Sequence, residues 1–131
     1  MAKKTILCLD DEKTILTSLK GQLKRNFGSA YGYEFAESPE EALELIDELV
    51  DEGVEILLIV SDWLMPGMKG DDFLIQVHQK HPGIVKIMLT GQADRDAVKR
   101  AEEEAMLYKC IQKPWQETEL ISTIKEGIAE L

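Results

Sequence analysis

Three aspartates stand where a metal ion and a phosphoryl group could be bound together. Asp10 and Asp11 follow the apolar segment Thr5-Leu9, and Asp62 follows the apolar segment Ile56-Ser61. Two carboxylates about 4 Å apart repel each other by about 4 kcal/mol at an effective dielectric constant of 20, so three gathered together need a cation. An oxygen-only pocket with room for water suits Mg2+, which often recruits a phosphate. The carboxylate of Asp62 could then act as a nucleophile toward phosphorus and form an aspartyl phosphate.

Two further polar residues follow apolar segments. Thr90 comes after Val85-Leu89, and Lys113 comes after Leu107-Ile111. A hydroxyl and an ammonium group in these places could bind phosphoryl oxygens and stabilise the charge that develops during transfer. In open parallel sheets, ligands bind beyond the carboxyl ends of the strands. The sequence therefore predicts that these side chains and the aspartates meet at one edge of a sheet.

Each of these residues also has a simpler interpretation when it is taken alone. Asp10 or Asp11 could cap the helix that follows, and Asp62 could be a turn residue. Thr90 could be a strand-end hydroxyl and Lys113 a solvated tip. These separate interpretations do not predict that all five residues converge on one edge, so their convergence favours a shared site.

The elements that must position these residues are five apolar segments that alternate with five amphipathic ones. This order is typical of a parallel sheet with crossover helices. The near-continuous aliphatic run at the centre of the chain suits a strand that is buried on both faces. The predicted strands are Thr5-Leu9, Tyr33-Ala36, Ile56-Ser61, Val85-Leu89 and Leu107-Ile111.

The predicted helices differ in how much apolar surface they offer. The second begins at Pro39, where Ser38 can cap it and Glu41 can complete a capping box. Three further helices are predicted over about 71–80, 93–105 and 116 to the end. The first helix has an apolar stripe at Ile15, Leu19, Leu23 and Phe27; the second has Ala42 or Leu43, Ile46, and Leu49 or Val50 facing inward; the fourth has only Ala97, Val98, Ala101 and Ala105; the fifth has Leu120, Ile124 and Ile128. The fourth helix should therefore be among the more loosely held elements.

The acidic composition limits the choice of partners. The chain has 131 residues, and its 25 Asp and Glu against 15 Lys and Arg give a net charge of -10. Ten acids and no base lie between Glu34 and Glu55, a stretch that we interpret as a solvated surface. Because a surplus of carboxylates opposes binding to phosphates, the sequence predicts no direct contact with nucleic acid.

Length and hydrophobicity predict one domain over residues 1–131. The longest aliphatic run, Ile56 to Val60, is far shorter than the ~20 residues needed to span a bilayer, and the start of the chain lacks the apolar region of a signal peptide. We therefore expect a cytoplasmic protein with no membrane contact. Cys8 and Cys110 lack the paired spacing of zinc or redox motifs and are interpreted as buried thiols.

The chemistry-bearing motifs occur in one order along the chain. They are Asp10-Asp11, then Asp62 within Ser-Asp-Trp-Leu-Met-Pro-Gly-Met-Lys-Gly, then Leu89-Thr90-Gly91, then Lys113-Pro114-Trp115. This set resembles the receiver domain of two-component response regulators, over essentially the whole chain. The resemblance implies an α/β fold, with a doubly wound five-stranded parallel sheet of order 2-1-3-4-5 in a flavodoxin-like three-layer sandwich. The first and fifth helices would cover one face and the second to fourth the other.

The resemblance also implies a role for each acid. Asp62 would be the phosphoacceptor and a ligand of Mg2+. Asp11 would bind the ion directly, with Asp10 beside it acting partly through water, and the backbone carbonyl of Leu64 would be a further ligand.

The same resemblance implies how the phosphoryl group is held and used. Thr90 and Lys113 would bind its oxygens, and the Lys113-Pro114 peptide would be cis. A histidine kinase or histidine phosphotransferase would donate the group. The fourth helix, fifth strand and fifth helix would then rearrange and change partners, which include a downstream output protein or domain, and the domain would be a monomer or a phosphorylation-dependent dimer.

The sequence departs from the family pattern at two places. The position three before the conserved lysine usually holds an aromatic residue, and here it is Cys110. Tyr108, two residues earlier, should share its face of the strand and could partly substitute for it, which leaves the aromatic switch of the family open. Leu64 is apolar where some relatives have a polar residue that helps water attack, from which we hypothesise a long-lived phosphoryl state, whereas Gln92 could act the other way. We interpret His78 and His81 as a solvated pair.

Three functions remain to be compared. The leading one is a phosphoacceptor signalling domain that performs its own Mg2+-dependent phosphorylation and dephosphorylation and turns over no external substrate, so we do not count it as an enzyme. The alternative is a receiver-like binding module that works without phosphorylation. A Mg2+-dependent aspartyl-nucleophile phosphatase would have an Asp-x-Asp near the first strand, and Asp10-Asp11-Glu12 lacks that spacing. The sequence does not identify an output domain, and it leaves open whether the receiver stands alone.

Overall fold

The computed structural model describes residues 4–91 and 95–131. It contains one five-stranded sheet in the order β2-β1-β3-β4-β5, in which every neighbouring pair is parallel. The strands are β1 (Thr5–Leu9), β2 (Gly32–Ala36), β3 (Ile56–Asp62), β4 (Val85–Thr90) and β5 (Lys109–Gln112). The helices are α1 (Lys13–Phe27), α2 (Pro39–Asp51), α3 (Gly70–Lys80), α4 (Arg95–Ala105) and α5 (Glu117–Ala129). The predicted fold class and strand order are confirmed.

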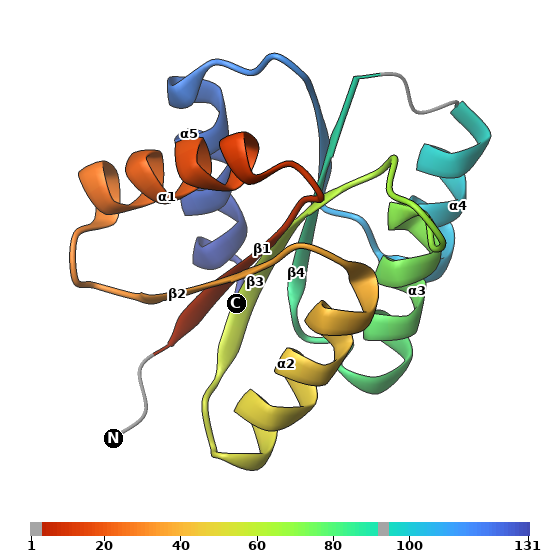
Figure 1. Cartoon of the computed structure of the whole chain (residues 1–131), viewed down its shortest axis with the longest axis horizontal. Helices are drawn as coiled ribbons and strands as arrows, with labels where there is room; N and C mark the ends of the chain where they lie inside the picture. The colour runs from red at the N-terminus through yellow and green to blue at the C-terminus, as the bar shows by residue number, and fades with distance from the viewer. Residues whose placement is uncertain (1–3, 92–94) are drawn as a thin grey trace.

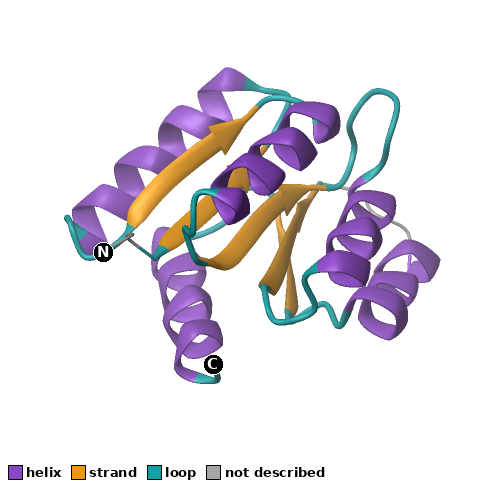
Figure 2. Ribbon diagram, turned by 90° about the horizontal axis from the view of Figure 1, so that it is seen from below, coloured by secondary structure: helices purple, strands orange, loops and turns teal. Residues whose placement is uncertain are grey.

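The sheet separates two layers of helices (Figure 1). Helices α1 and α5 pack on one face, and α2, α3 and α4 pack on the other, as Figure 2 shows from a second direction. All seven residues of β3 are buried, which confirms the prediction of a central strand covered on both faces. We call the two sides the α1/α5 face and the α2–α4 face.

The apolar stripe of α1 is buried at its centre and only partly buried at its ends. Leu16, Leu19 and Leu23 are buried, whereas Ile15 and Phe27 are only partly buried. An α-helix turns by 3.6 residues, so a row of residues spaced by four drifts around the helix, and its two ends leave the buried side. The predicted stripe is therefore confirmed: Leu19 and Leu23 are buried, Ile15 and Phe27 pack at its edges, and Leu16 is a buried residue that the spacing of four did not include.

The start of α2 agrees with its sequence signal except in one bond. The Ser38 side chain accepts a hydrogen bond from the backbone N–H of Glu41 (3.1 Å), and Pro39 is the first helical residue. The Glu41 carboxylate, however, accepts from the backbone N–H of Glu37 (3.3 Å) and not from that of Ser38. On the inward side of α2, the sequence left two positions open. The structure decides them in favour of Ala42 and Leu49, which are buried together with Ile46.

Helix α4 has the small interface that its sequence predicted. Its buried residues are Ala97, Ala101 and Ala105, so it contributes little apolar area. The predicted start at Ala93 lies outside the described residues.

The remaining expectations concern cysteines and membrane contact. Cys8 is buried, but Cys110 is only half-buried, because β5 lies at the edge of the sheet. The two thiols are unpaired and stand three strands apart. Within residues 4–91 and 95–131, no helix is long and apolar enough to cross a bilayer.

Candidate functional site

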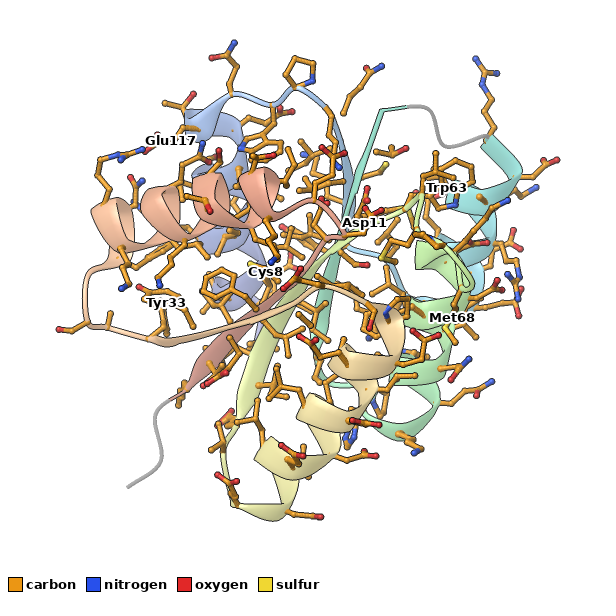
Figure 3. The ribbon with its side chains drawn as sticks, viewed as in Figure 1. Cys8, Asp11, Tyr33, Trp63, Met68 and Glu117 are labelled. Carbon is orange, nitrogen blue, oxygen red and sulfur yellow. The ribbon has the colours of Figure 1, made fainter. Side chains whose placement is uncertain are left out.

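The three aspartates meet at the carboxyl edge of the sheet. Asp10 directly follows β1, and Asp62 is the last residue of β3, the strand that pairs with β1. One carboxylate oxygen from each of Asp10, Asp11 and Asp62 lies within 4.8 Å of the others. Asp10 is completely buried and Asp62 is 4% exposed, whereas Asp11 is exposed at the mouth of the cluster, where Figure 3 labels it. The site is therefore buried on one side and open to solvent on the other.

Lys113 joins the two buried carboxylates. Its Nζ donates to Asp62 Oδ1 at 2.9 Å and to Asp10 Oδ2 at 3.0 Å. The other oxygen of Asp10 accepts from the backbone N–H of Glu12 at 2.8 Å. Asp10 is thus held by two donors, and neither Asp10 nor Asp11 caps α1, whose N-cap residue is Glu12.

Burial and the neighbouring charges shift the pKa values of both Asp62 and Lys113. Burial raises the pKa of the Asp62 carboxyl to about 6, and the neighbouring Asp10 acts in the same direction, while the hydrogen bond from Lys113 opposes the change. Burial opposes the charged form of Lys113, but its hydrogen bonds to Asp62 and Asp10 outweigh this effect and raise its pKa. Lys113 is therefore an ammonium ion at neutral pH, and it compensates only part of the negative charge.

The strand ends place Thr90 next to this cluster. Thr90 is buried at the end of β4, and the residue before it, Leu89, lies opposite Asp62 in the register. The carbonyl of Thr90 accepts from the backbone N–H of Lys113 at 2.8 Å, and the Lys113–Pro114 peptide is cis, as the resemblance implied. All five predicted side chains, Asp10, Asp11, Asp62, Thr90 and Lys113, lie at one edge of the sheet, which the separate interpretations of each residue do not explain.

The donor set fits a hard divalent cation. It offers carboxylate oxygens only, one of its residues is open to solvent, and one ammonium balances three carboxylates only in part. Leu64, whose carbonyl the resemblance adds to the ligand set, is 49% exposed in the loop after β3. The role of that carbonyl stays a prediction, and Gln92 lies outside the described residues.

The prediction that Tyr108 shares the face of Cys110 is wrong, so Tyr108 does not stand in for the missing aromatic. Cys110 packs toward the α2–α4 face, whereas Tyr108 packs toward the α1/α5 face, against Gly127 of α5. The alternation of side chains applies only within a strand, and β5 begins at Lys109, one residue after Tyr108. Met106, two residues before Tyr108, has a positive φ of 51°, so the backbone turns shortly before β5 begins.

Sequence reasoning missed a polar cluster beside the site. The indole of Trp63, the residue after Asp62, donates to Asp71 Oδ1 at 3.1 Å, and Asp71 Oδ2 accepts from Arg100 of α4 at 3.1 Å. Lys69 also lies over the Trp63 ring, with its Nζ 5.5 Å from the centroid. Asp71 resembled an ordinary first-turn acid of a helix, and nothing in the sequence pairs it with Arg100.

A buried lysine was also missed. Lys86, the second residue of β4, is 1% exposed and donates to the carbonyl of Ile84 at 2.7 Å. Its Nζ lies 3.1 Å from Nδ1 of His78, so His78 is not part of a solvated pair as expected. Burial lowers the pKa of Lys86 to about 8. Its flanking residues Val85 and Ile87 gave it the pattern of an ordinary exposed strand position.

The comparison with known families decides what this geometry belongs to. The response regulator receiver domain family matches residues 6–125. The chain belongs to that family. This receiver domain is 32% identical over 124 residues to the hydrogenase transcriptional regulatory protein HoxA of Cupriavidus necator. The match covers 95% of this chain but only 24% of HoxA, so the chain spans about a quarter of that relative.

Relatives of different architecture contain the same unit. The sensor kinase CckA of Brucella abortus is 32% identical over 122 residues, which are 93% of this chain and 12% of CckA. Among solved structures, the signal receiver domain of an HD domain-containing protein from Pseudomonas fluorescens superposes with a TM-score of 0.86 at 28% identity, covering 98% of this chain and 96% of that one. A CheY-like receiver domain protein from Methanospirillum hungatei gives a TM-score of 0.85 at 31% identity, with the same coverage of 98% and 96%.

Proposed function

We propose that this receiver domain accepts a phosphoryl group on Asp62, in a Mg2+-dependent reaction, from a phosphohistidine of a histidine kinase or histidine phosphotransferase. The observation that carries the proposal is the contact of Asp62 with Lys113 at 2.9 Å beside the carboxylates of Asp10 and Asp11. A buried carboxylate in contact with a lysine, next to two further acids, is suited to receive a charged group that brings or requires a cation.

The transfer is a displacement at phosphorus. A carboxylate oxygen of Asp62 forms the new O–P bond while the P–N bond of the phosphohistidine breaks, and the electron pair of that bond stays on the imidazole nitrogen, which takes a proton. Nothing is oxidised or reduced. Hydrolysis later breaks the O–P bond by addition of water and restores the Asp62 carboxylate and inorganic phosphate.

The residues around Asp62 have distinct tasks in this reaction. Asp10 and Asp11 would hold a Mg2+ ion together with Asp62 and the carbonyl of Leu64, and the ion would supply positive charge to the phosphoryl oxygens. Lys113 changes partners from the carboxylates to a phosphoryl oxygen, to which it brings a positive charge. The hydroxyl of Thr90 donates a hydrogen bond to another of these oxygens.

The donor would approach beside Lys113. A groove of about 380 Å3 lies there between α1 and the segment after β5, and its walls are Ile15, Ser18, Gln22, Lys113, Pro114 and Trp115. The Trp115 indole donates to Gln22 Oε1 at 2.8 Å, which fixes the groove next to the acid cluster. An apolar groove of this kind suits a helical partner that carries the phosphohistidine.

The biological output would follow from a changed binding surface. Phosphorylation would rearrange α4, β5 and α5, and these elements would then bind a downstream output protein or domain, as a monomer or as a dimer. The domain would turn over no external substrate, so we propose that it is not an enzyme. We also propose that the reaction takes place in the cytoplasm, where the sequence led us to expect the protein.

Intact-mass spectrometry after incubation with acetyl phosphate and Mg2+ tests the proposal. Wild type should gain the mass of one phosphoryl group, and Asp62→Asn should gain none. The matched control is Asp96→Asn on α4, which removes an exposed carboxylate outside the site and should be phosphorylated like wild type. Absence of the added mass in wild type would favour the phosphorylation-independent binding module, to which the placement of Tyr108 and Cys110 lends its support.

The lifetime of the phosphoryl group depends on the residue at position 64. Leu64 is half exposed beside the site and cannot orient a water molecule, because it has no polar side-chain atom. We therefore expect slow loss of the phosphoryl group in buffer with Mg2+, and faster loss in Leu64→Asn. Equal rates in the two proteins would reject a role for this position.

A further inference from the structure

The domain needs a physical link between Asp62 and α4 that differs from the usual one. β5 carries no aromatic side chain, and Tyr108 packs on the α1/α5 face, away from α4. Among the described residues, side chains on the α2–α4 face offer another connection from the phosphoacceptor to α4.

Trp63 is fixed tightly between Asp62 and the start of α3. Its backbone N–H donates to the carbonyl of Leu89 at 3.0 Å, and its carbonyl accepts from the N–H of Gly70 at 2.8 Å. A Cβ on Gly70 would collide with the carbonyl oxygen of Asp62, so only glycine allows this close approach. A displacement of Asp62 or Trp63 is therefore transmitted directly to the first turn of α3.

Asp71 in that first turn connects Trp63 to α4. Its side chain is 10% exposed, and its two oxygens have different partners: Oδ1 accepts from the indole of Trp63 at 3.1 Å, and Oδ2 accepts from Nη1 of Arg100 at 3.1 Å. The same Nη1 contacts Asp72 Oδ1 at 2.5 Å. In Figure 3, Trp63 lies on the side of the sheet that α3 and α4 cover.

These polar contacts are a large part of what holds α4. Its fully buried residues are three alanines, each of which buries only one methyl group, and Val98 adds a partly buried side chain. The other described ion pairs of α4, Lys99–Glu103 and Arg100–Glu104, lie within the helix and attach it to nothing else. The position of α4 therefore depends on Arg100 more than the position of a well-packed helix would.

We propose that the hydrogen-bond chain Trp63–Asp71–Arg100 couples the phosphoryl state of Asp62 to the attachment of α4, with Asp71 and Arg100 as positioning residues. This hydrogen-bond chain is intact in the unphosphorylated domain and holds α4 against α3. A phosphoryl group on Asp62 displaces Trp63, weakens the contact between Asp71 and Arg100, and loosens α4. This inference rests on the proposed phosphorylation of Asp62.

Thermodynamic reciprocity makes the inference measurable at the site itself. If occupancy of Asp62 weakens the attachment of α4, then loss of that attachment must strengthen binding at Asp62 by the same factor. The probe is beryllium trifluoride with Mg2+, which mimics a phosphoryl group on a carboxylate. Its dissociation constant can be measured in the Trp115→Phe background, where Trp63 is the one tryptophan left of two and reports by its emission.

Two variants break the hydrogen-bond chain Trp63–Asp71–Arg100, and two keep it. Arg100→Ala removes the donor, and Asp71→Asn keeps an acceptor for the indole but loses the charge that pairs with Arg100. Arg100→Lys retains a cation, and Lys99→Ala removes a neighbouring charge of α4 that does not contact Asp71. In the free protein, we expect amide hydrogen exchange over residues 95–105 to rise in the first two variants and to stay near the wild-type rate in the last two.

The affinity for the probe decides between coupling and a purely structural role. Arg100→Ala and Asp71→Asn should bind beryllium trifluoride about tenfold more tightly than Lys99→Ala, with Arg100→Lys near the control value. A faster-exchanging α4 with unchanged affinity would overturn the inference and leave the proposed function intact. Failure of wild type to bind the probe would overturn both.

Discussion

The two faces of the sheet are stabilised in different ways. The α1/α5 face is filled by large aliphatic side chains, and among its completely buried members are Leu19, Leu23, Leu120 and Ile124. The α2–α4 face also has a hydrophobic core, but Lys86 and Asp71 are buried on that side, and α4 contributes three buried alanines and the partly buried Val98. Apolar packing is rigid and tolerates little displacement, whereas a small interface with charged contacts can be rearranged at lower cost.

This difference assigns separate tasks to the two faces. The α1/α5 face supports β1 and β3, whose ends carry Asp10 and Asp62, and so it keeps the acid cluster in place. The α2–α4 face carries the helix that would move, together with the polar groups that hold it. Mutations that reduce packing should therefore have large effects on the first face, and mutations of charged groups should have large effects on the second.

The largest expected effect is on the α1/α5 face. Leu120→Ala should lower the free energy of unfolding by about 3 kcal/mol, because Leu120 is completely buried and its removal leaves a cavity. Urea denaturation measures this value. Val50→Ala is the control, since Val50 is 40% exposed and its truncation should cost less than about 0.5 kcal/mol. Equal losses in the two variants would contradict the description of a tightly packed face.

The buried amine of the α2–α4 face should give a pH-dependent effect. The pKa of Lys86 falls from its ordinary value of 10.5 to about 8 in the folded protein, so the unfolded chain binds this proton more tightly. The contribution of Lys86 to the free energy of unfolding is therefore lowest below about pH 8 and rises as the pH increases toward 10.5. At neutral pH, the folded protein carries the full cost of a buried charge.

Lys86→Met should remove that cost. We expect the variant to be more stable than wild type at about pH 7, and this advantage should shrink by about 3 kcal/mol by about pH 10. The measurement is urea denaturation of both proteins at several pH values from about 7 upward, because their difference cancels the titrating groups that do not contact Lys86; His78, whose pKa Lys86 helps to lower, is mutated to Asn in both proteins. If the difference between the two free energies of unfolding does not vary with pH, the pKa of Lys86 is not shifted in the folded protein.

The smallest expected effect is on α4. Ala101→Gly should lower the free energy of unfolding by about 1 kcal/mol, since it removes one buried methyl group and reduces helix propensity. Chemical denaturation and amide exchange over residues 95–105 measure it. A loss as large as that of Leu120→Ala would mean that α4 is held by packing, and the contrast between the faces would not stand.

The order of elements and the strand ends could be predicted from sequence because both depend on local patterns. Apolar segments of four to six residues marked every strand, and the polar residues after the segments marked the edge of the sheet. Asp10, Asp62, Thr90 and Lys113 were therefore placed correctly, since parallel strands bring their carboxyl ends together.

The misplaced residues depend on geometry that a local pattern does not contain. The buried Leu16 was missed because a spacing of four only approximates the 3.6 residues of a helical turn, so Ile15 lies at the edge of the buried side and Leu16 lies within it. Tyr108 was assigned to the face of Cys110, but the strand starts one residue too late for the alternation to include it. Both errors arise at the ends of elements, where the regular repeat stops.

The missed residues depend on contacts between distant segments. Arg100 reaches Asp71 across 29 positions of sequence, and the ion pair forms only because α4 packs beside α3. Lys86 lies in a strand where a single charge is typical of an exposed position, and its burial results from the coverage by α3 and the contact with His78. No pattern within one element predicts either pair.

The central claim is that Asp62, and no other carboxylate of the cluster, receives the phosphoryl group. Borohydride reduces an acyl phosphate to an alcohol, so after incubation with acetyl phosphate and Mg2+ it should convert Asp62, and only that residue, to homoserine. Tandem mass spectrometry of the digested protein locates this conversion. Homoserine at position 62 that disappears when Mg2+ is removed is the result that the structure predicts; homoserine at position 10 or 11, or at none of the three, would contradict it.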